Sequence, residues 1–213
     1  MNLLEEYTGG SGVFIQIGAG AGDLDSSARY RDGFTEFIKK LPRERIKKII
    51  LVEPNPINIP FLKECWKDYP EAVIFELAII PKQMNVSTID LFYCPDDGPH
   101  YQVASINKKH IQKHYGEKCA IDKFIIQTTT INEFIKNNTE SEIELLSLDI
   151  EGIDSEIIME IDFTVNNVKF FSFEYIHIED IDTIHHKLNG ARFTFIGKGV
   201  DYNGYDFLYV RDS

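Results

Sequence analysis

The segment from Val13 to Asp23 constrains this chain most, because it joins a short apolar strand to a loop with three glycines. It reads Val-Phe-Ile-Gln-Ile-Gly-Ala-Gly-Ala-Gly-Asp. The β-branched and aromatic residues at its start predict a buried parallel strand. Gly18, Gly20 and Gly22 permit positive φ and let a ligand lie directly on the backbone. In α/β proteins, a strand with such a turn holds a nucleotide-like ligand at its carboxyl end.

The spacing of these glycines favours one ligand over others. A dinucleotide fingerprint would place its third glycine three residues after Gly20, where this chain has Asp23. A G-x-G-x-G loop brings backbone amides to the zwitterionic tail of an amino acid, so we expect S-adenosylmethionine. The alternative is a glycine-rich turn that only lets a helix pack closely on a strand.

Apolar segments alternate with amphipathic ones along most of the chain. Strands are expected at residues 13–17, 46–52, 72–80, 89–93, 124–130, 144–149 and 169–174. Asp32 is a candidate N-cap for a helix that Pro42 ends. Residues 193–196 and 207–210 predict a closing β-hairpin. The sequence therefore predicts an α/β fold, a mostly parallel sheet with helices on both faces and an antiparallel terminal strand, in a single domain over residues 1–213.

Several of the predicted strands end in an acid or are followed by one. Glu53 ends the second strand, where one carboxylate can accept from both vicinal hydroxyls of a ribose. Asp149 ends the strand over residues 144–149, Glu151 lies two residues beyond it, and Glu174 ends the strand over residues 169–174. Because carboxyl ends of parallel strands meet at one edge, we expect the last three acids to be neighbours.

Such a cluster of carboxylates has several possible roles. Crowded like charges raise one pKa, which suits a general base. His177, just beyond Glu174, is a further candidate base or a surface histidine. The same oxygens could hold Mg²⁺, so Mg is possible but not predicted. Alternatively, Asp149 and Glu151 only stabilise the N-terminus of the helix that follows them.

His110 and His114 are spaced i, i+4, which can hold a metal ion on a helix. No third ligand is evident nearby, and lysines surround the pair. We therefore interpret this stretch as a solvated helix face and predict no metal site.

Composition limits the partners and the compartment. The formal net charge is −12, the opposite of the basic footprint that nucleic acid or an anionic membrane requires. Cys65, Cys94 and Cys119 show no C-x-x-C spacing, which favours reduced thiols and a cytoplasmic location. We expect no secretory signal, since Met1 to Gly12 lacks a basic apolar leader. The sequence contains no run of 18 apolar residues, so we expect no membrane-spanning helix.

Taken in order, these motifs resemble the FkbM-like S-adenosylmethionine-dependent methyltransferases. The matching segments are Ile17-Gly18-Ala19-Gly20-Ala21-Gly22-Asp23, Glu53-Pro54-Asn55-Pro56, Ala78, Thr129-Thr130-Ile131, Leu148-Asp149-Ile150-Glu151-Gly152 and Phe173-Glu174. The resemblance implies a Rossmann-like class I methyltransferase fold, a seven-stranded sheet of order 3-2-1-4-5-7-6 with strand 7 antiparallel. It also implies methyl transfer to a hydroxyl, commonly on a sugar or polyketide-like acceptor.

The resemblance also implies roles for individual residues. The three glycines would hold the methionine part, Glu53 the ribose, and Asn55 and Ala78 the neighbourhood of the adenine, while Asp149 and Glu151 would line the methyl-donor pocket. Gln16, Ala19 and Pro54 belong to the same expected site. The family usually has Asp where this chain has Gln16, and often Asn where it has Gly20. The contact to the methionine ammonium is therefore expected to be neutral or rerouted.

The expected function is S-adenosylmethionine-dependent O-methylation of a small molecule or sugar, without nucleic acid or membrane as partner. Two alternatives remain open at this point. An NAD-type oxidoreductase is disfavoured by Asp23 and by the terminal hairpin. A non-catalytic binding module on the same fold would keep donor binding without turnover. The oligomeric state is not indicated by the sequence.

Overall fold

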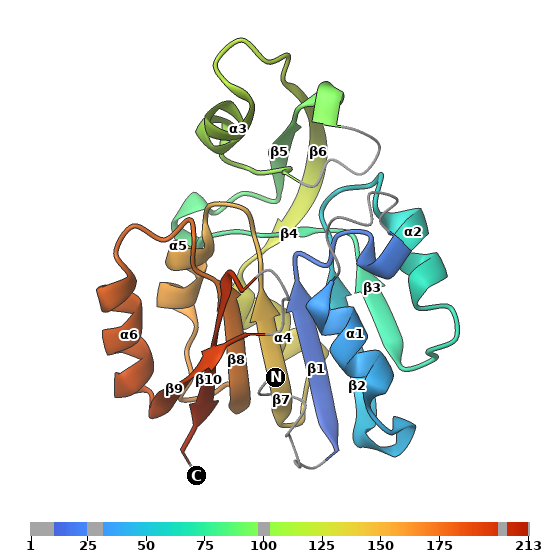
Figure 1. Ribbon diagram of the computed structural model, residues 1–213, viewed down its shortest axis with the longest axis vertical. Coiled ribbons are helices and arrows are strands. Elements are labelled where there is room, and N and C mark those ends of the chain that lie inside the picture. The colour runs from blue at the N-terminus through green and yellow to red at the C-terminus, as the bar shows by residue number, and fades with distance from the viewer. Residues whose placement is uncertain (1–10, 25–31, 98–102, 200–203, 213) are drawn as a thin grey trace.

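A seven-stranded sheet forms the centre of the computed structural model, which describes residues 11–24, 32–97, 103–199 and 204–212 (Figure 1). Its order is β3-β2-β1-β7-β8-β10-β9. The strands are β1 (Gly12–Ile17), β2 (Ile46–Val52), β3 (Ala72–Phe75), β7 (Ile143–Leu148), β8 (Val168–Glu174), β9 (Phe193–Lys198) and β10 (Asp206–Arg211). Strand β10 is antiparallel to both neighbours, and the pairs from β3 to β8 are parallel. The predicted sheet, its order and its antiparallel strand are confirmed.

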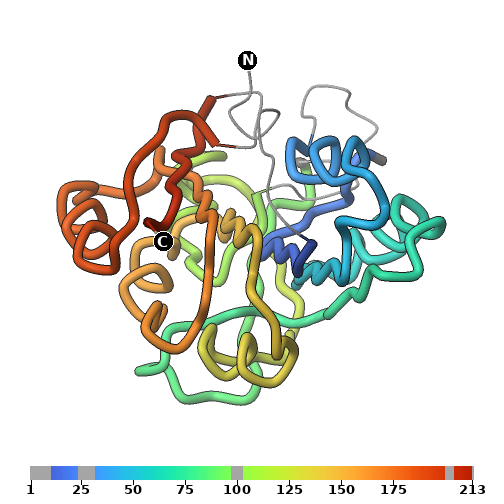
Figure 2. The backbone as a smooth tube through the Cα atoms, turned by 90° about the horizontal axis from the view of Figure 1, so that it is seen from below, coloured from blue at the N-terminus to red at the C-terminus, as the bar shows by residue number. Residues whose placement is uncertain are grey.

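Helices cover both faces of this sheet, because alternate residues of each strand point to opposite sides. Helices α1 (Gly33–Lys40) and α2 (Ile59–Cys65) pack on one face, in a cluster that includes Phe14 and Leu51. Helices α4 (Ile131–Asn138), α5 (Asp154–Glu160) and α6 (Ile181–Gly190) pack on the other, with Ile15 and Ile17. Figure 2 shows α1 and α4 on opposite sides. Within the described ranges, no helix has the length and apolarity needed to cross a membrane.

The start of α1 is fixed by the predicted cap. The Asp32 carboxylate accepts hydrogen bonds from the amides of Phe34 and Thr35, both at 3.2 Å. The helix ends at Lys40, two residues before Pro42. Short 3-10 turns lie at Gly22–Leu24, Arg43–Arg45, Lys82–Met84 and Pro95–Asp97.

A second, small sheet lies beyond the carboxyl edge of the main sheet (Figure 1). Its order is β4-β6-β5, and its strands are β4 (Ala78–Ile79), β5 (Thr88–Tyr93) and β6 (Asp122–Thr129). Helix α3 (Lys108–Tyr115) lies beside it. The small sheet has its own buried apolar cluster, made of Ala78, Ile80, Leu91 and Ile126.

The prediction of one strand over residues 72–80 is wrong. Phe75 makes the last pairing with β2, and its carbonyl accepts from the amide of Glu53 at 3.0 Å. The chain then leaves the main sheet, and Ala78 and Ile79 pair with β6 instead. The apolar pattern runs through both strands because both are partly buried, so it does not mark the change of partner.

The glycine loop is pressed against the end of β7. Gly18 has φ +84°, and a Cβ built on it would lie 1.7 Å from the main-chain oxygen of Asp149. The Asp149 amide in turn donates to the Ile17 carbonyl at 2.9 Å. Gly20 has φ +55°, but a Cβ there would meet no atom within 4 Å. Gly18 is therefore required by the packing of two strands, whereas Gly20 faces open space.

These two glycines give a matched pair of substitutions. Gly18→Ala should lower the free energy of unfolding by about 3 kcal/mol or more, because backbone strain adds to a main-chain clash. Gly20→Ala should cost about 1–2 kcal/mol, the penalty for a left-handed residue alone. Urea unfolding followed by circular dichroism measures both values. Equal losses in the two variants would contradict the assigned contact between the loop and β7.

Candidate active site

Glu53 closes the glycine loop from the end of β2. Its side chain is buried, and Oε2 accepts from the Gly20 amide at 2.6 Å. Its Oε1 accepts from the Asn55 amide at 2.8 Å and from Asn58 Nδ2 at 3.3 Å. Burial raises the pKa of Glu53 to about 7, although these donors oppose the rise. A carboxylate oxygen accepts about two hydrogen bonds, so Oε2 can accept one more donor.

Gln16 lies beside this loop on the face of β1 that carries α1. Its Nε2 donates to Asp32 Oδ1 at 2.9 Å. Its Oε1 is buried and has no hydrogen-bond partner among the described residues. A buried acceptor without a donor is costly, so this atom suits a ligand that brings an N–H group.

The other residues expected around the donor have structural partners. Ala19 is buried in the cluster under α1, and its amide donates to the Val52 carbonyl at 3.0 Å. Asn55 is buried after Pro54, and its Oδ1 accepts from the Ile57 amide at 3.0 Å. Ala78 lies on β4, in the core of the small sheet. The proximity of Asn55 and Ala78 to an adenine stays a prediction.

Three acids gather at the carboxyl edge of the main sheet, as the strand ends indicated. Asp149 follows β7 directly beside Gly18, and its Oδ1 is buried with no partner among the described residues. Burial raises the pKa of Asp149 well above its ordinary value, and the charges of Glu151 and Glu174 raise it further. Glu174, at the end of β8, is itself buried. The structure thus places an acid of raised proton affinity next to the loop.

The start of α5 is organised by Asp154 rather than by the two acids before it. The Asp154 carboxylate accepts from the amides of Ile150 at 2.9 Å and Gly152 at 3.3 Å. Burial raises its pKa to about 6. Within the described chain, no amide of α5 donates to Asp149 or Glu151. A hydrogen-bonded cap from these two acids is therefore absent among the described residues, and their electrostatic effect on the helix N-terminus stays a prediction.

Histidines lie beside the acids at this edge. The prediction that His110 lies on a solvated helix face is wrong. His110 is buried, with its Nε2 3.0 Å from Glu151 Oε2. His177 follows β8, and its Nε2 lies 3.7 Å from Glu174 Oε2. Burial lowers the pKa of His177, and His110 lowers it further. His114 is exposed, with its ring centroid 4.6 Å from that of His110.

The missed grouping has a simple origin. Sequence spacing relates His110 only to His114, one helical turn away. Glu151 and His177 reach the same place from the ends of two strands of the main sheet. The i, i+4 pair was the available signal, and the fold supplies the remaining groups.

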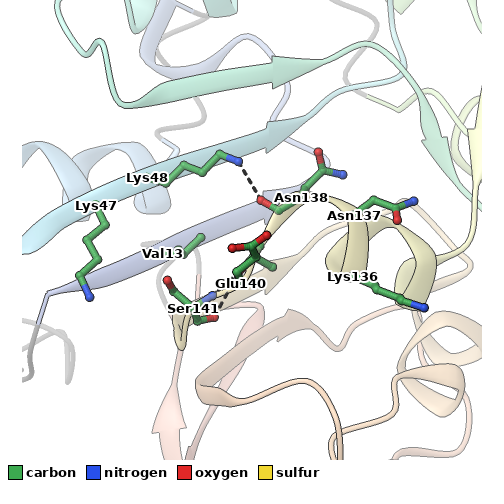
Figure 3. Close-up of a pocket in the computed structure, with 9 residues that line it drawn as sticks. Val13, Lys47, Lys48, Lys136, Asn137, Asn138, Glu140 and Ser141 are labelled. Carbon is green, nitrogen blue, oxygen red and sulfur yellow. Dashed lines mark hydrogen bonds between the residues drawn. The ribbon is translucent and has the colours of Figure 1, made fainter.

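A separate cavity of about 440 Å³ lies at the amino-terminal edge of the main sheet (Figure 3). It is lined by the first residues of β1 and β2 and by the end of α4, including Lys47, Lys48 and Lys136. Lys48 Nζ donates to the Asn138 carbonyl at 2.7 Å across it. The cavity lies at the opposite end of the parallel strands from the glycine loop. None of the predicted site residues lines it.

Comparison with solved structures gives matches at low sequence identity. The FkbM methyltransferase from Methylobacillus flagellatus KT is 13% identical, with 94% of this chain and 43% of that chain covered and a TM-score of 0.49. The METTL16 methyltransferase domain is 8% identical, with 99% and 63% covered and a TM-score of 0.52. The human methyltransferase 10 domain containing protein is also 8% identical, with 96% and 73% covered and a TM-score of 0.50. The last two share the fold with this chain.

The chain spans less than half the length of the Methylobacillus protein. No curated protein matches it. The methyltransferase FkbM domain matches residues 16–203, a range that runs from Gln16 past the acidic edge to the final hairpin. Because this match covers most of the sequence, the chain belongs to the FkbM methyltransferase domain family.

Proposed function

We propose that this chain transfers a methyl group from S-adenosylmethionine to a hydroxyl of a neutral small molecule or sugar. The observation that carries the proposal is the contact between Gly18 and the backbone of Asp149. It places the expected donor loop next to a cluster of acids at the carboxyl edge, where ligands of such sheets bind. A methyl donor bound at the loop would therefore lie next to a carboxylate that can accept a proton.

The residues around the loop fit the donor. Gly20 leaves open space above the backbone, and Gln16 Oε1 is a buried acceptor that an ammonium group would satisfy. Glu53 has room for one ribose hydroxyl on Oε2. Asp32, which contacts Gln16, adds a negative charge that favours a cationic amino-acid tail. Bound there, S-adenosylmethionine supplies an electrophilic methyl on a positively charged sulfur.

Asp149 is the proposed base or acceptor-orienting group. A raised pKa means that its carboxyl keeps a proton more readily than an ordinary aspartate. A positive charge nearby favours the ionised form. Asp149 would thus be ready to take the hydroxyl proton once the loop is occupied, while Glu174 and Glu151 orient the acceptor or hold the proton afterwards.

The negative charge of the site favours a neutral acceptor over a polyanionic one. Three carboxylates meet at this edge, and the chain has a net charge of −12. A polyanionic acceptor would be repelled, whereas a neutral polyol donates hydrogen bonds to carboxylates. This supports a hydroxyl-rich neutral acceptor.

Isothermal calorimetry tests the donor. S-adenosylmethionine and its demethylated product should each bind with one site per chain, and NAD should give no heat of binding. Binding of NAD alone would contradict the proposal and favour an oxidoreductase. A panel of hydroxylated small molecules, assayed for the demethylated product, then tests turnover and separates an enzyme from a binding module.

Replacement of Glu53 tests the donor placement. Glu53→Ala should weaken S-adenosylmethionine binding by roughly 1.5–3 kcal/mol, as for hydrogen bonds to a charged group. Glu76→Ala, which removes an exposed acid just after the neighbouring strand β3, serves as the matched control and should bind normally. Calorimetry gives both affinities, with circular dichroism as the check of folding. Unchanged affinity in Glu53→Ala would contradict the proposed contact between Glu53 and the ribose.

The affinity of the wild-type chain should also depend on pH. The native pKa of Glu53, about 7, lies above the ordinary value of 4.5, so the empty site keeps a proton at pH 6. A carboxylate accepts a ribose hydroxyl and attracts the cationic donor best when ionised, so binding should release that proton. Affinity should rise by up to about tenfold from pH 6 to pH 8. Calorimetry at the two pH values measures this rise, and Glu53→Gln should reduce it; an equal rise in that variant would point to another group.

Asp149→Asn tests the catalytic assignment. It should keep most of the donor affinity and lose roughly 10²–10⁴-fold in turnover, because a hydroxyl needs a positioned base. Glu156→Gln, an exposed acid in the first turn of α5, is the matched control. Wild-type turnover in Asp149→Asn would remove Asp149 from the mechanism. A loss in Glu151→Gln or Glu174→Gln instead would move the role to that residue.

A further inference from the structure

Three histidines and one glutamate converge above the acidic edge, and the proposed methyl transfer leaves most of this group without a role. Helix α3 contributes His110 and His114, the turn after β7 contributes Glu151, and the segment after β8 contributes His177. One ligating atom from each residue lies within 4.8 Å of every other. We propose that these four side chains bind a divalent first-row transition-metal ion such as Zn²⁺.

The distances suit such an ion after small side-chain rotations. A tetrahedral Zn²⁺ with bonds near 2.0–2.1 Å holds its ligand atoms about 3.4 Å apart. Glu151 Oε2 lies 3.0 Å from His110 Nε2 and 4.0 Å from His177 Nε2. The ring centroids of His110 and His177 are 4.6 Å apart, and those of His114 and His177 are 5.2 Å apart. All four ligand atoms lie within 4.8 Å of one another, so the longest separation must shorten by up to about 1.4 Å to reach this value.

The hydrogen bonding of the cluster also favours a cation. Neutral imidazole is the form that binds metals. His177 Nδ1 is buried and has no hydrogen-bond partner among the described residues, so this ring has an unsatisfied nitrogen in either tautomer. A metal ion bound through Nδ1 would give this nitrogen the partner that the described residues do not supply.

The backbone around Glu151 is built to bring it to the histidines. Glu151 has φ +53°, which is unfavourable for a residue with a side chain. A Cβ at Gly152 would lie 2.5 Å from His110 Nδ1, so only glycine allows the ring to approach. Ser105 Oγ donates to the Glu151 carbonyl at 2.6 Å and ties the segment before α3 to this turn. Contacts from separate segments thus hold Glu151 and His110 in place.

The donor set selects the kind of metal. Imidazole nitrogens suit Zn²⁺, Cu²⁺, Ni²⁺ and Fe²⁺, whereas Mg²⁺ prefers oxygen ligands in a near-octahedral arrangement. A site with three imidazoles therefore differs from the carboxylate-bound Mg²⁺ considered from the sequence. Because α3 belongs to the small-sheet region, the ion would also fasten that region to the main sheet.

Cobalt titration tests the site directly. The full chain, free of any polyhistidine tag, is treated with a chelator, dialysed and titrated with Co²⁺, with visible d–d absorption as the readout. One Co²⁺ per chain should bind with tetrahedral bands, and Zn²⁺ should displace it. Less than one Co²⁺ per chain, or displacement by Mg²⁺ at the same concentration as Zn²⁺, would overturn the proposal.

Variants separate this site from adventitious binding. His114 is exposed, so His114→Ala should fold normally and lose at least about 100-fold in Co²⁺ affinity, as should His177→Ala. His186→Ala, an exposed histidine on α6, is the matched control and should bind like the wild type. Wild-type affinity in His114→Ala would overturn the proposal.

A second readout does not use the metal spectrum. Zn²⁺ should raise the melting temperature of the wild type and of His186→Ala, because a ligand that binds only the native state stabilises it. His114→Ala should show no such rise, and an equal rise would contradict the site. The inference does not rest on the proposed function: S-adenosylmethionine calorimetry fails or succeeds independently of Co²⁺ binding.

Discussion

The contact between Gly18 and the main chain of Asp149 is the constraint on which the rest of this structure depends. Strands β1 and β7 pair in parallel up to Ile17 and Leu148, and the next residues stay in contact, with Gly18 packed against the carbonyl of Asp149. From β1 the chain winds outward to β2 and β3, and it later returns to the other side of β1 as β7. The direction of winding reverses at this pair, and ligands of open α/β sheets bind at such a point. The glycine loop and the acidic turn are therefore brought together by topology.

The electrostatics of this edge are unfavourable for the folded chain by itself. Asp149 is buried close to the charges of Glu151, Glu174, Asp154 and Asp206, and all four raise its pKa. An acid whose native pKa is raised binds its proton more tightly when folded, so its contribution to stability falls as pH rises toward that pKa. Acids held against such a cost are typical of functional sites, where a substrate or an ion supplies the missing charge.

The main sheet was predictable from the sequence because each of its strands is a local apolar pattern with a clear end. Val13 to Ile17 is buried throughout, and Asp32 caps α1 through its own carboxylate. The small sheet was not predictable in the same way. Glu76 interrupts the apolar run, but no local signal indicates that β3 pairs with β2 whereas β4 pairs with β6. Local propensity describes a strand, and tertiary packing decides its sheet.

The candidate site was likewise predictable only where its residues lie at the ends of predicted strands. Gly18, Glu53 and Asp149 were recognisable because each follows a predicted strand, so their meeting at one edge follows from the fold class. The partners of Glu53 were not foreseen, because the amides of Gly20 and Asn55 point inward only in the folded loop. The grouping of His110 with His177 depends on how α3 lies over the main sheet, and spacing along one segment carries no such information.

The small sheet has a consequence for how sequences of this kind can diverge. Ala78, Ile80, Leu91 and Ile126 form a cluster of their own, while Ile79 packs in the main core and the partly buried Ile106 packs against both. Changes in the small sheet and α3 therefore alter what stands over the acidic edge while strands β1 and β2 keep their packing. The region over the acidic edge can therefore change at a different rate from the strands that hold the glycine loop.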